Sequence, residues 1–260
     1  MEIPNIKANF FGDFQLYING KEITYEDWKS KKALTVYKFL LYHRNTKIEK
    51  DILVELLWPD GNRNRAQNLY TTIYNLQKTL NSFIDSDQKF KFTICSNGLY
   101  LCNNDIDYEI DTENFKKYHQ KGIKIEPNDK TKALDFYQTA LIYYTNDFLT
   151  EELYTDWIIE QRAFFREIYI DLALKTAQII SETTNKYEIP LKICKLALTS
   201  DKYREELHEA ILHFLLKLNR NVEATKWYNQ YSKMVFQEFG LTPSFKIREL
   251  FEKVDTPDNK

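Results

Sequence analysis

Residues 62–80 read NRNRAQNLYTTIYNLQKTL, and this stretch decides the fold. At 100° per residue, its apolar side chains fall within one arc of about 80°. They are Ala66, Leu69, Ile73, Leu76 and Leu80. The opposite arc is polar and carries Gln67, Thr71, Tyr74, Asn75 and Lys78, with Asn68 at its edge. The pattern predicts an amphipathic helix from about Arg65 to Leu80, buried on one face and exposed on the other.

The charge of this stretch indicates a nucleic-acid partner. It holds Arg63, Arg65 and Lys78 but no acidic residue, whereas the whole chain has a formal net charge of −2. DNA bases are read by amide, hydroxyl and guanidinium groups, and carboxylates close to phosphates are repelled. A helix with an apolar back, a polar front and arginines at its start therefore suits the major groove. The alternative is a solvated helix face, since any amphipathic helix has a polar side.

The elements before this helix are two strands and two helices. The strands are expected from Ile6 to Phe14 and from Gln15 to Ile23, with Asn19-Gly20 as a hairpin-turn signal. A first helix is expected after Ser30, which is a suitable N-cap. A second is expected from about Lys47 to Leu57, with Ile48, Ile52, Leu53, Leu56 and Leu57 inward.

A β-hairpin follows the third helix. Its strands are expected at 90–94 and 99–102, on either side of Ser96-Asn97-Gly98. Strands, three helices and a hairpin in this order predict a winged helix-turn-helix domain over residues 1–107, an α+β fold whose third helix reads DNA.

Further DNA contacts are expected outside the third helix. Lys31 and Lys32 lie where the first helix begins and could meet phosphates, although a solvated charge run explains them equally well. The hairpin tip presents Asn97 to the minor groove. The candidate DNA-binding residues are Lys31, Lys32, Arg63, Arg65, Gln67, Asn68, Thr71, Tyr74, Asn75, Lys78 and Asn97.

The second part of the chain, residues 108–255, reads as helical throughout. Helices are expected at about 112–121, 130–144, 151–183, 188–199, 203–218, 221–239 and 244–253. The segments 186–191 and 220–225 correspond to each other about 34 residues apart, which is the tetratricopeptide period. We expect an all-α, tetratricopeptide-like domain.

The order of several short motifs resembles SARP-family transcriptional activators, in which an OmpR-type winged helix precedes a bacterial transcriptional activator domain. In the first part the motifs are Trp28-Lys29-Ser30-Lys31-Lys32-Ala33-Leu34, Leu57-Trp58-Pro59-Asp60 and Arg65-Ala66-x-Asn68-Leu69 with Ile73, Leu76 and Leu80. In the second they are Tyr144-x-x-Asp147-Phe148-Leu149, Tyr154-x-Asp156-Trp157, Arg204-Glu205-Glu206-x-His208 and Glu238-Phe239-Gly240-Leu241-x-Pro243-Ser244. The resemblance covers roughly residues 7 to 253.

This resemblance implies an activator that binds direct repeats in promoter DNA, recruits RNA polymerase and self-associates on DNA. The binding positions that carry over are Lys31, Lys32, Arg63, Arg65, Asn68, Thr71 and Asn75. The sequence also departs from the family pattern. A basic residue that is usual near the end of the third helix is Gln77 here, which we expect to alter a phosphate contact.

Composition excludes several other classes. Only 6 of 260 residues are glycine, and neither a dinucleotide-binding, a P-loop nor a serine-hydrolase motif occurs. His208 and His213 stand five apart, so they do not share one helix face as zinc-protease ligands do. The acidic run Glu151, Glu152, Asp156 and Glu160 is more typical of a solvated face than of acid–base catalysis. We therefore expect no enzyme activity, no cofactor and no metal.

Three cysteines without metal-like spacing, no leader-like N-terminus and no long apolar stretch predict a cytoplasmic protein without a membrane partner. One competing function stays open. Helical repeats form concave surfaces, and aromatic residues such as Tyr137, Trp157, Trp227, Tyr228 and Tyr231 could line one. In that case the helical part is a protein- or ligand-binding adaptor, and the winged helix is a protein-interaction scaffold.

Overall fold

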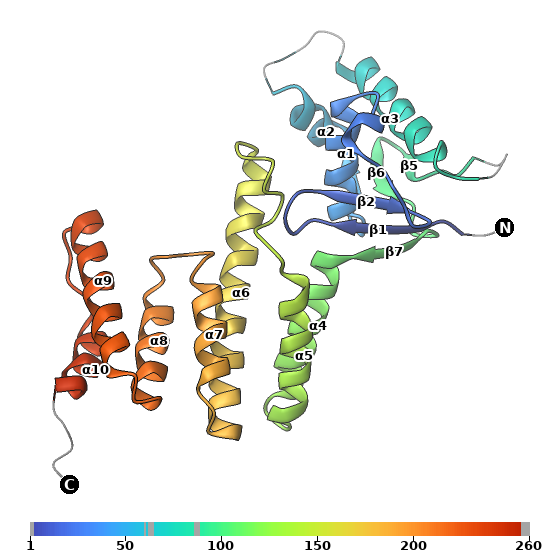
Figure 1. Ribbon diagram of the computed structural model, residues 1–260. Helices are drawn as coiled ribbons and strands as arrows, with labels where there is room; N and C mark the ends of the chain where they lie inside the picture. Colours follow the sequence, from blue (N-terminus) through green and yellow to red (C-terminus); the bar gives the residue numbers. More distant parts are fainter. Residues whose placement is uncertain (1–2, 60, 62–64, 86–88, 256–260) are drawn as a thin grey trace. The chain divides into compact units, whose positions relative to one another are not determined.

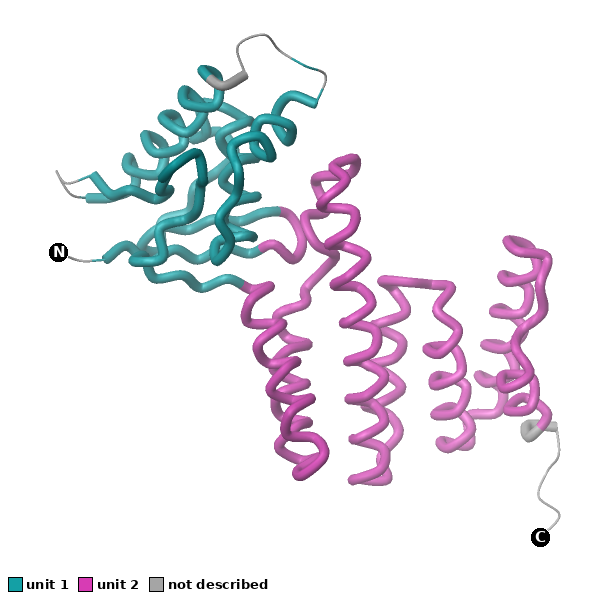
Figure 2. Tube along the Cα trace, turned by 180° about the vertical axis from the view of Figure 1, so that it is seen from behind, with its two compact units in different colours: residues 1–9, 14–110 teal, residues 10–13, 111–260 magenta. Residues whose placement is uncertain are grey.

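The computed structural model describes residues 3–59, 61, 65–85 and 89–255. The chain divides into two compact units, which Figure 2 shows in different colours. Unit 1 comprises residues 1–9 and 14–110, and unit 2 comprises residues 10–13 and 111–260. Our expected domain limits, 1–107 and 108–255, remain a proposal; the compact units divide three residues later and assign residues 10–13 to the second part.

Unit 1 begins with a small sheet. It contains β1 (Asn5–Asn9), β2 (Gln15–Ile18), β3 (Lys21–Glu22) and β7 (Asp107–Ile110), in the order β3-β2-β1-β7. The expected Asn19-Gly20 turn joins β2 to β3, and both residues have positive φ, as a type I′ hairpin turn requires. The strand β7, which pairs in parallel with β1, was not expected from the sequence.

Three helices form the helix-turn-helix part: α1 (Lys31–Tyr42), α2 (Lys50–Leu57) and α3 (Arg65–Asn81) (Figure 1). Ser30 caps α1 as expected, since its Oγ accepts a hydrogen bond from the Ala33 N–H at 3.3 Å. Of the predicted stripe of α3, Leu69, Leu76 and Leu80 are fully buried and Ile73 is half-buried, while the side chain of Ala66 lies outside the description. Thr72 and Thr79 join this buried side.

The expected second helix is partly wrong. Ile48 and Glu49 form a short strand, β4, which pairs with β6 (Leu99–Cys102), and the helix starts only at Lys50. Ile52, which we expected to be buried, is exposed, and Leu56 is half-buried. A pairing with a strand fifty residues away overrides the local helical pattern here.

The wing is a hairpin of β5 (Thr93–Ser96) and β6, joined at Asn97-Gly98, where both residues again have positive φ. Together with β4 it makes a three-stranded sheet in the order β4-β6-β5. Unit 1 is therefore a winged helix-turn-helix.

Unit 2 is an array of helices in which each packs against its neighbours in sequence. The helices are α4 (Asp111–Ile125), α5 (Lys130–Tyr143), α6 (Asp156–Thr184), α7 (Glu188–Ala197), α8 (Glu205–Lys217), α9 (Asn221–Phe239) and α10 (Phe245–Asp255) (Figure 1). This confirms the expected all-α, tetratricopeptide-like architecture. None of the helices in the described residues is long and apolar enough to cross a membrane.

Residues 10–13 belong to unit 2 because they are hydrogen-bonded into it. The Asp111 carboxylate accepts the N–H groups of Phe10 and Phe11, both at 2.8 Å, and the Leu149 N–H donates to the Phe10 carbonyl. The Phe11 ring packs edge-on against the ring of Phe165, with centroids 5.1 Å apart.

The motif Tyr144-x-x-Asp147-Phe148-Leu149, one of those that carry the resemblance, has a structural role in unit 2. The Tyr144 hydroxyl donates to the Asp147 carboxylate at 2.6 Å, and Asp147 also pairs with Arg166. Arg162 donates to the Phe148 and Glu152 carbonyls. These bonds hold an irregular segment before α6, which therefore starts at residue 156 rather than at the expected 151.

Gly122, which directly follows the helix expected at 112–121, marks a close contact between two helices. It lies inside α4, and a Cβ built there would be 2.2 Å from the Tyr137 ring on α5. The Tyr137 hydroxyl donates to Glu126, the residue that follows α4. The absence of a side chain at 122 thus lets α4 and α5 approach.

Candidate nucleic-acid interface

The exposed face of α3 has the composition that the sequence predicted. Gln67, Thr71, Tyr74 and Lys78 are exposed, while Asn68 and Asn75 are half-buried at its edge. We call these six residues the reading face. Within the part of the chain that the structure describes, no hydrogen bond or ion pair engages the side chain of Gln67, Asn68, Tyr74, Asn75 or Lys78, and Thr71 bonds only to a carbonyl of its own helix. The face is polar, free of acids and available to a partner.

Tyr70 lies beside the reading face and was missed by sequence reasoning. Its ring is 52% exposed, and the Lys50 ammonium group stands 5.1 Å from the ring centroid. Its angular position on the helix, 60° from Gln67 at about 100° per residue, was the available signal. We add Tyr70 and Lys50 to the candidates.

The two candidate arginines are described only in part. Arg63 lies outside the described residues. Arg65 is the first residue of α3, and its side chain also lies outside the description. Their contribution stays a prediction from the sequence.

The two candidate lysines of α1 differ in their surroundings. The Lys32 ammonium group donates to the Leu57 carbonyl at the end of α2, at 2.7 Å, and lies 4.3 Å from the Trp58 ring centroid. Burial lowers the pKa of Lys32. Lys31 is exposed beside Tyr25, and a hydrogen bond to that residue raises the pKa of Lys31. Lys32 therefore holds α1 to α2, whereas Lys31 presents a full charge to solvent.

The end of α3 has a hollow of about 440 Å³. It is lined by Tyr74, Gln77, Lys78, Asn81, Ser82 and Lys89. Two of these side chains are lysines and none is acidic, which suits a phosphate group.

Asn97, the remaining candidate, is exposed at the tip of the wing. Gln77, which we expected to alter a phosphate contact, bonds to Phe92 and to Thr93, the first residue of β5.

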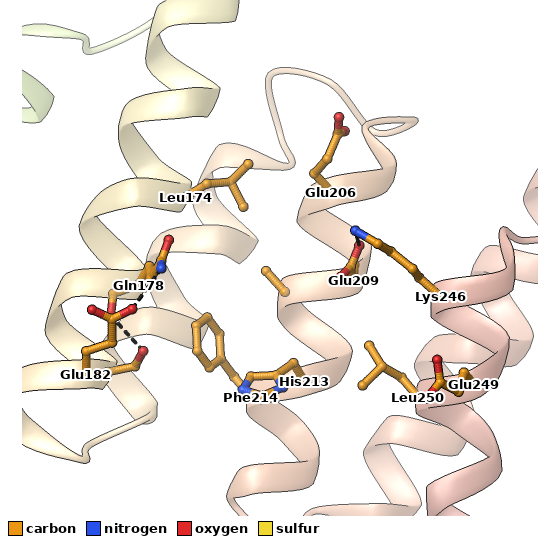
Figure 3. Close-up of a pocket in the computed structure, with 12 residues that line it drawn as sticks. Leu174, Gln178, Glu182, Glu206, Glu209, His213, Phe214, Lys246, Glu249 and Leu250 are labelled. Carbon is orange, nitrogen blue, oxygen red and sulfur yellow. Dashed lines mark hydrogen bonds and ion pairs between the residues drawn. The ribbon is translucent and has the colours of Figure 1, made fainter.

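Unit 2 has a hollow of its own, of about 590 Å³, between α6, α8 and α10 (Figure 3). Three of its four carboxylates, those of Glu182, Glu206 and Glu209, have neighbours of opposite charge. Glu182 pairs with Lys130 at 2.9 Å and Glu209 with Lys246 at 3.9 Å, and Glu206 lies 3.0 Å from the guanidinium of Arg204. These pairs offset the charge of three of the four carboxylates in the hollow.

The histidine pair of α8 has a structural environment. His208 is buried, its Nε2 lies 2.9 Å from the Lys202 carbonyl, and its ring stacks on Tyr231 at 4.0 Å. Burial lowers the pKa of His208, as expected for a neutral core histidine. Among the described residues no group of three or more His, Cys, Asp or Glu side chains could hold a metal ion.

A winged helix-turn-helix followed by an array of helix pairs is the layout of a modular transcriptional regulator. Residues 110–255 match the family model of the bacterial transcriptional activator domain, so the chain belongs to that family. This confirms the predicted resemblance to SARP-family regulators. The family is one of transcriptional regulators rather than a class of enzymes.

A solved structure with a similar fold is Mycobacterium tuberculosis EmbR in complex with a low affinity phosphopeptide. The TM-score is 0.77 and the sequence identity is 16%, over 98% of this chain and 66% of the EmbR chain. The chain thus spans just under two thirds of EmbR's length. The comparison with curated proteins gave no match.

Proposed function

We propose that the chain binds promoter DNA sequence-specifically, with α3 in the major groove. The observation that carries this proposal is the reading face: six polar side chains on one helix, without an acid among them and with none of them bonded to another element in the described residues. Such side chains read base edges in winged-helix complexes. Lys78 and Lys89 at the end of α3 supply phosphate contacts.

The wing and α1 complete the interface in this proposal. Asn97 enters the adjacent minor groove, and Lys31, whose charge faces solvent, contacts the backbone of one DNA strand. Arg63 and Arg65 act at the start of α3. Because the resemblance implies direct repeats, we propose that two copies bind side by side and that the bound protein recruits RNA polymerase. We further propose that the protein acts in the cytoplasm.

The proposal is tested by selecting sites from a randomised duplex pool and titrating the enriched duplex. We expect specific binding whose affinity falls steeply with salt; with about four phosphate contacts, log K has a slope near −4 against log salt. Asn75→Ala should weaken specific binding, while Gln138→Ala, an exposed amide on α5, serves as the matched control. Absence of binding at about 50 mM salt would reject the proposal, since electrostatic attraction is strong there.

The second candidate, a protein- or ligand-binding adaptor, has the hollow of unit 2 as its supporting observation. This candidate would be favoured only if the selection from the randomised duplex pool enriched no DNA sequence. We favour DNA binding because three carboxylates of that hollow, Glu182, Glu206 and Glu209, pair within the protein, whereas no described residue outside α3 pairs with the side chains of the reading face.

A further inference from the structure

Two side-chain amides on α3 face the segment that leads into the wing. Asn81 bonds to one residue of that segment in both directions. Its Nδ2 donates to the Phe90 carbonyl at 2.9 Å, and its Oδ1 accepts from the Phe90 N–H at 2.8 Å. An amide used in this way satisfies a backbone donor and a backbone acceptor together, as a neighbouring strand would.

Gln77 does the same one turn earlier. Its Nε2 donates to the Thr93 carbonyl at 3.0 Å and to the Thr93 hydroxyl at 2.8 Å, while its Oε1 accepts from the Phe92 N–H at 3.0 Å. Asn81 also donates to the Gln77 carbonyl at 2.8 Å, which ties the second amide to the helix backbone. We call Gln77 and Asn81 the amide clamp.

The spacing of the clamp matches that of an extended chain. Four helical residues rise about 6.0 Å, and two strand residues span about 6.6 Å, so two amides at i and i+4 meet two sites on one extended segment. Both clamp residues are half-buried. The segment 90–93 is thereby held on one side by α3, while Thr93 pairs with Cys102 of β6 on the other.

The clamp lies next to the reading face. Gln77 and Asn81 line the same hollow as Tyr74 and Lys78, and Lys89, just before the clamped segment, completes it. A change in the clamp would therefore move the wing relative to the side chains proposed to read DNA.

We propose that Gln77 and Asn81 are positioning residues that fix the wing against α3, so that the wing tip and the reading face meet DNA as one rigid body. This inference rests on the proposed DNA binding. A wing held in place before binding loses no conformational freedom on contact with DNA, which improves affinity. A clamp with a purely structural role would affect every DNA contact alike.

A double-mutant cycle tests the inference in the full-length chain. Gln77→Met keeps the size of the side chain and removes its hydrogen bonds. Asn97→Gly removes the proposed wing contact and keeps the positive φ of that position. In the wild-type background Asn97→Gly should weaken binding to the selected duplex about tenfold, and in the Gln77→Met background less than about twofold. Asn75→Ala, on the reading face, should cost the same in both backgrounds.

A second variant, Asn81→Leu, and a second measurement, hydrogen exchange, test the same inference independently. Asn81→Leu should reproduce the loss of coupling, so either variant suffices if the other fails to fold. Hydrogen exchange of the Phe90 and Phe92 amides should become faster in both variants without DNA. Gln138→Met on α5 is the control and should change neither the coupling nor the exchange.

The outcomes separate this inference from the function on which it rests. Specific binding by the wild type, together with an equal cost of Asn97→Gly in all backgrounds, overturns the clamp and leaves DNA binding intact. Unchanged exchange at Phe90 and Phe92 also overturns the clamp. Absence of specific binding by the wild type rejects the proposed function and, with it, the positioning role.

Discussion

The reading face of unit 1 and the hollow of unit 2 differ in whether their polar side chains have partners within the protein. In the hollow, Glu182 and Glu209 each pair with a lysine of the same unit. On α3, side chains such as Tyr74 and Lys78 have no hydrogen-bond or ion-pair partner within the described residues. Polar groups paired internally contribute to architecture, whereas polar groups left open on one helix face are available for an external partner. This difference is our reason for proposing that unit 1 binds DNA.

We expect the largest effect, a loss of stability, from a substitution at the contact between α4 and α5 in unit 2. In Gly122→Leu the new side chain meets the Tyr137 ring, because a Cβ at 122 would be only 2.2 Å away. We expect a loss of about 3–4 kcal/mol in the free energy of unfolding, measured by urea denaturation. Gly240→Asn is the control, since no atom lies within 4 Å of its Cβ and Asn tolerates its positive φ. Equal stabilities of the two variants would contradict the close α4–α5 contact.

The second effect concerns the carboxylate that binds residues 10–13 into unit 2. Burial raises the pKa of Asp111 to about 6, although backbone N–H groups of Phe11, Phe10 and Thr112 oppose the rise. The folded-state pKa is above that of the unfolded chain, so the native state binds more protons between about pH 4 and 6. Stability should therefore increase by about 2–3 kcal/mol as the pH falls through this range, and this gain is lost as the pH rises through 6.

The check on Asp111 is a comparison of pH profiles. Asp111→Asn cannot titrate, so its free energy of unfolding, measured by denaturation at several pH values, should lack this increase. The variant is expected to be less stable overall, because an amide cannot accept all three N–H groups. Parallel profiles for the wild type and the variant would show that Asp111 does not titrate in this range.

The third effect sharpens the role of the reading face. Asn75→Ala and Arg65→Ala should each weaken specific DNA binding by about 2 kcal/mol, a factor of about 30 in Kd. The free energy of unfolding of Asn75→Ala should change by less than about 0.5 kcal/mol, because its side chain bonds to nothing in the described residues. Titration of the selected duplex and urea denaturation measure the two quantities. Unchanged affinity in both variants would show that we have chosen the wrong face.

A smaller effect distinguishes phosphate contacts from base reading. Lys78→Ala should weaken binding to specific and scrambled duplexes alike, by about fivefold at 0.1 M salt, and reduce the salt slope by about one. Titrations at four salt concentrations give this slope. A loss confined to the specific duplex would instead assign Lys78 to base recognition.

The smallest effect concerns the hollow of unit 2. Glu209→Gln removes one member of a long ion pair with the largely exposed Lys246, and should leave DNA affinity and stability nearly unchanged. Titration and denaturation check both values. A loss of DNA affinity beyond about threefold would show that the hollow takes part in DNA binding, contrary to our account.

The sequence predicted elements whose signals are local. The three leucines of the α3 stripe, the Ser30 cap and the Asn97-Gly98 turn all depend on residues a few positions apart, and all are confirmed. The strand β7 was missed and the start of α2 was misplaced, because both depend on pairing with distant strands. Gly122 was misread for the same reason, since its role requires the ring of Tyr137 on another helix.

The candidate site shows the same limit. The polar arc of α3 follows from its 100° periodicity, so the reading face could be derived before the fold was known. The roles of Lys32 and Gln77 could not, because their partners are the Leu57 carbonyl and the backbone at Phe92 and Thr93. We expected Lys32 to contact a DNA phosphate and Gln77 to alter such a contact, but both side chains form hydrogen bonds within the protein.

Methylation interference on the selected duplex tests the central claim most directly. A methyl group on guanine N7 blocks the major-groove edge of that base and leaves the minor groove unchanged. We predict that methylation at defined guanines within each half-site prevents binding, and that Asn75→Ala relieves this interference at a subset of them. Binding that tolerates N7 methylation at every guanine of the site would contradict the placement of α3 in the major groove.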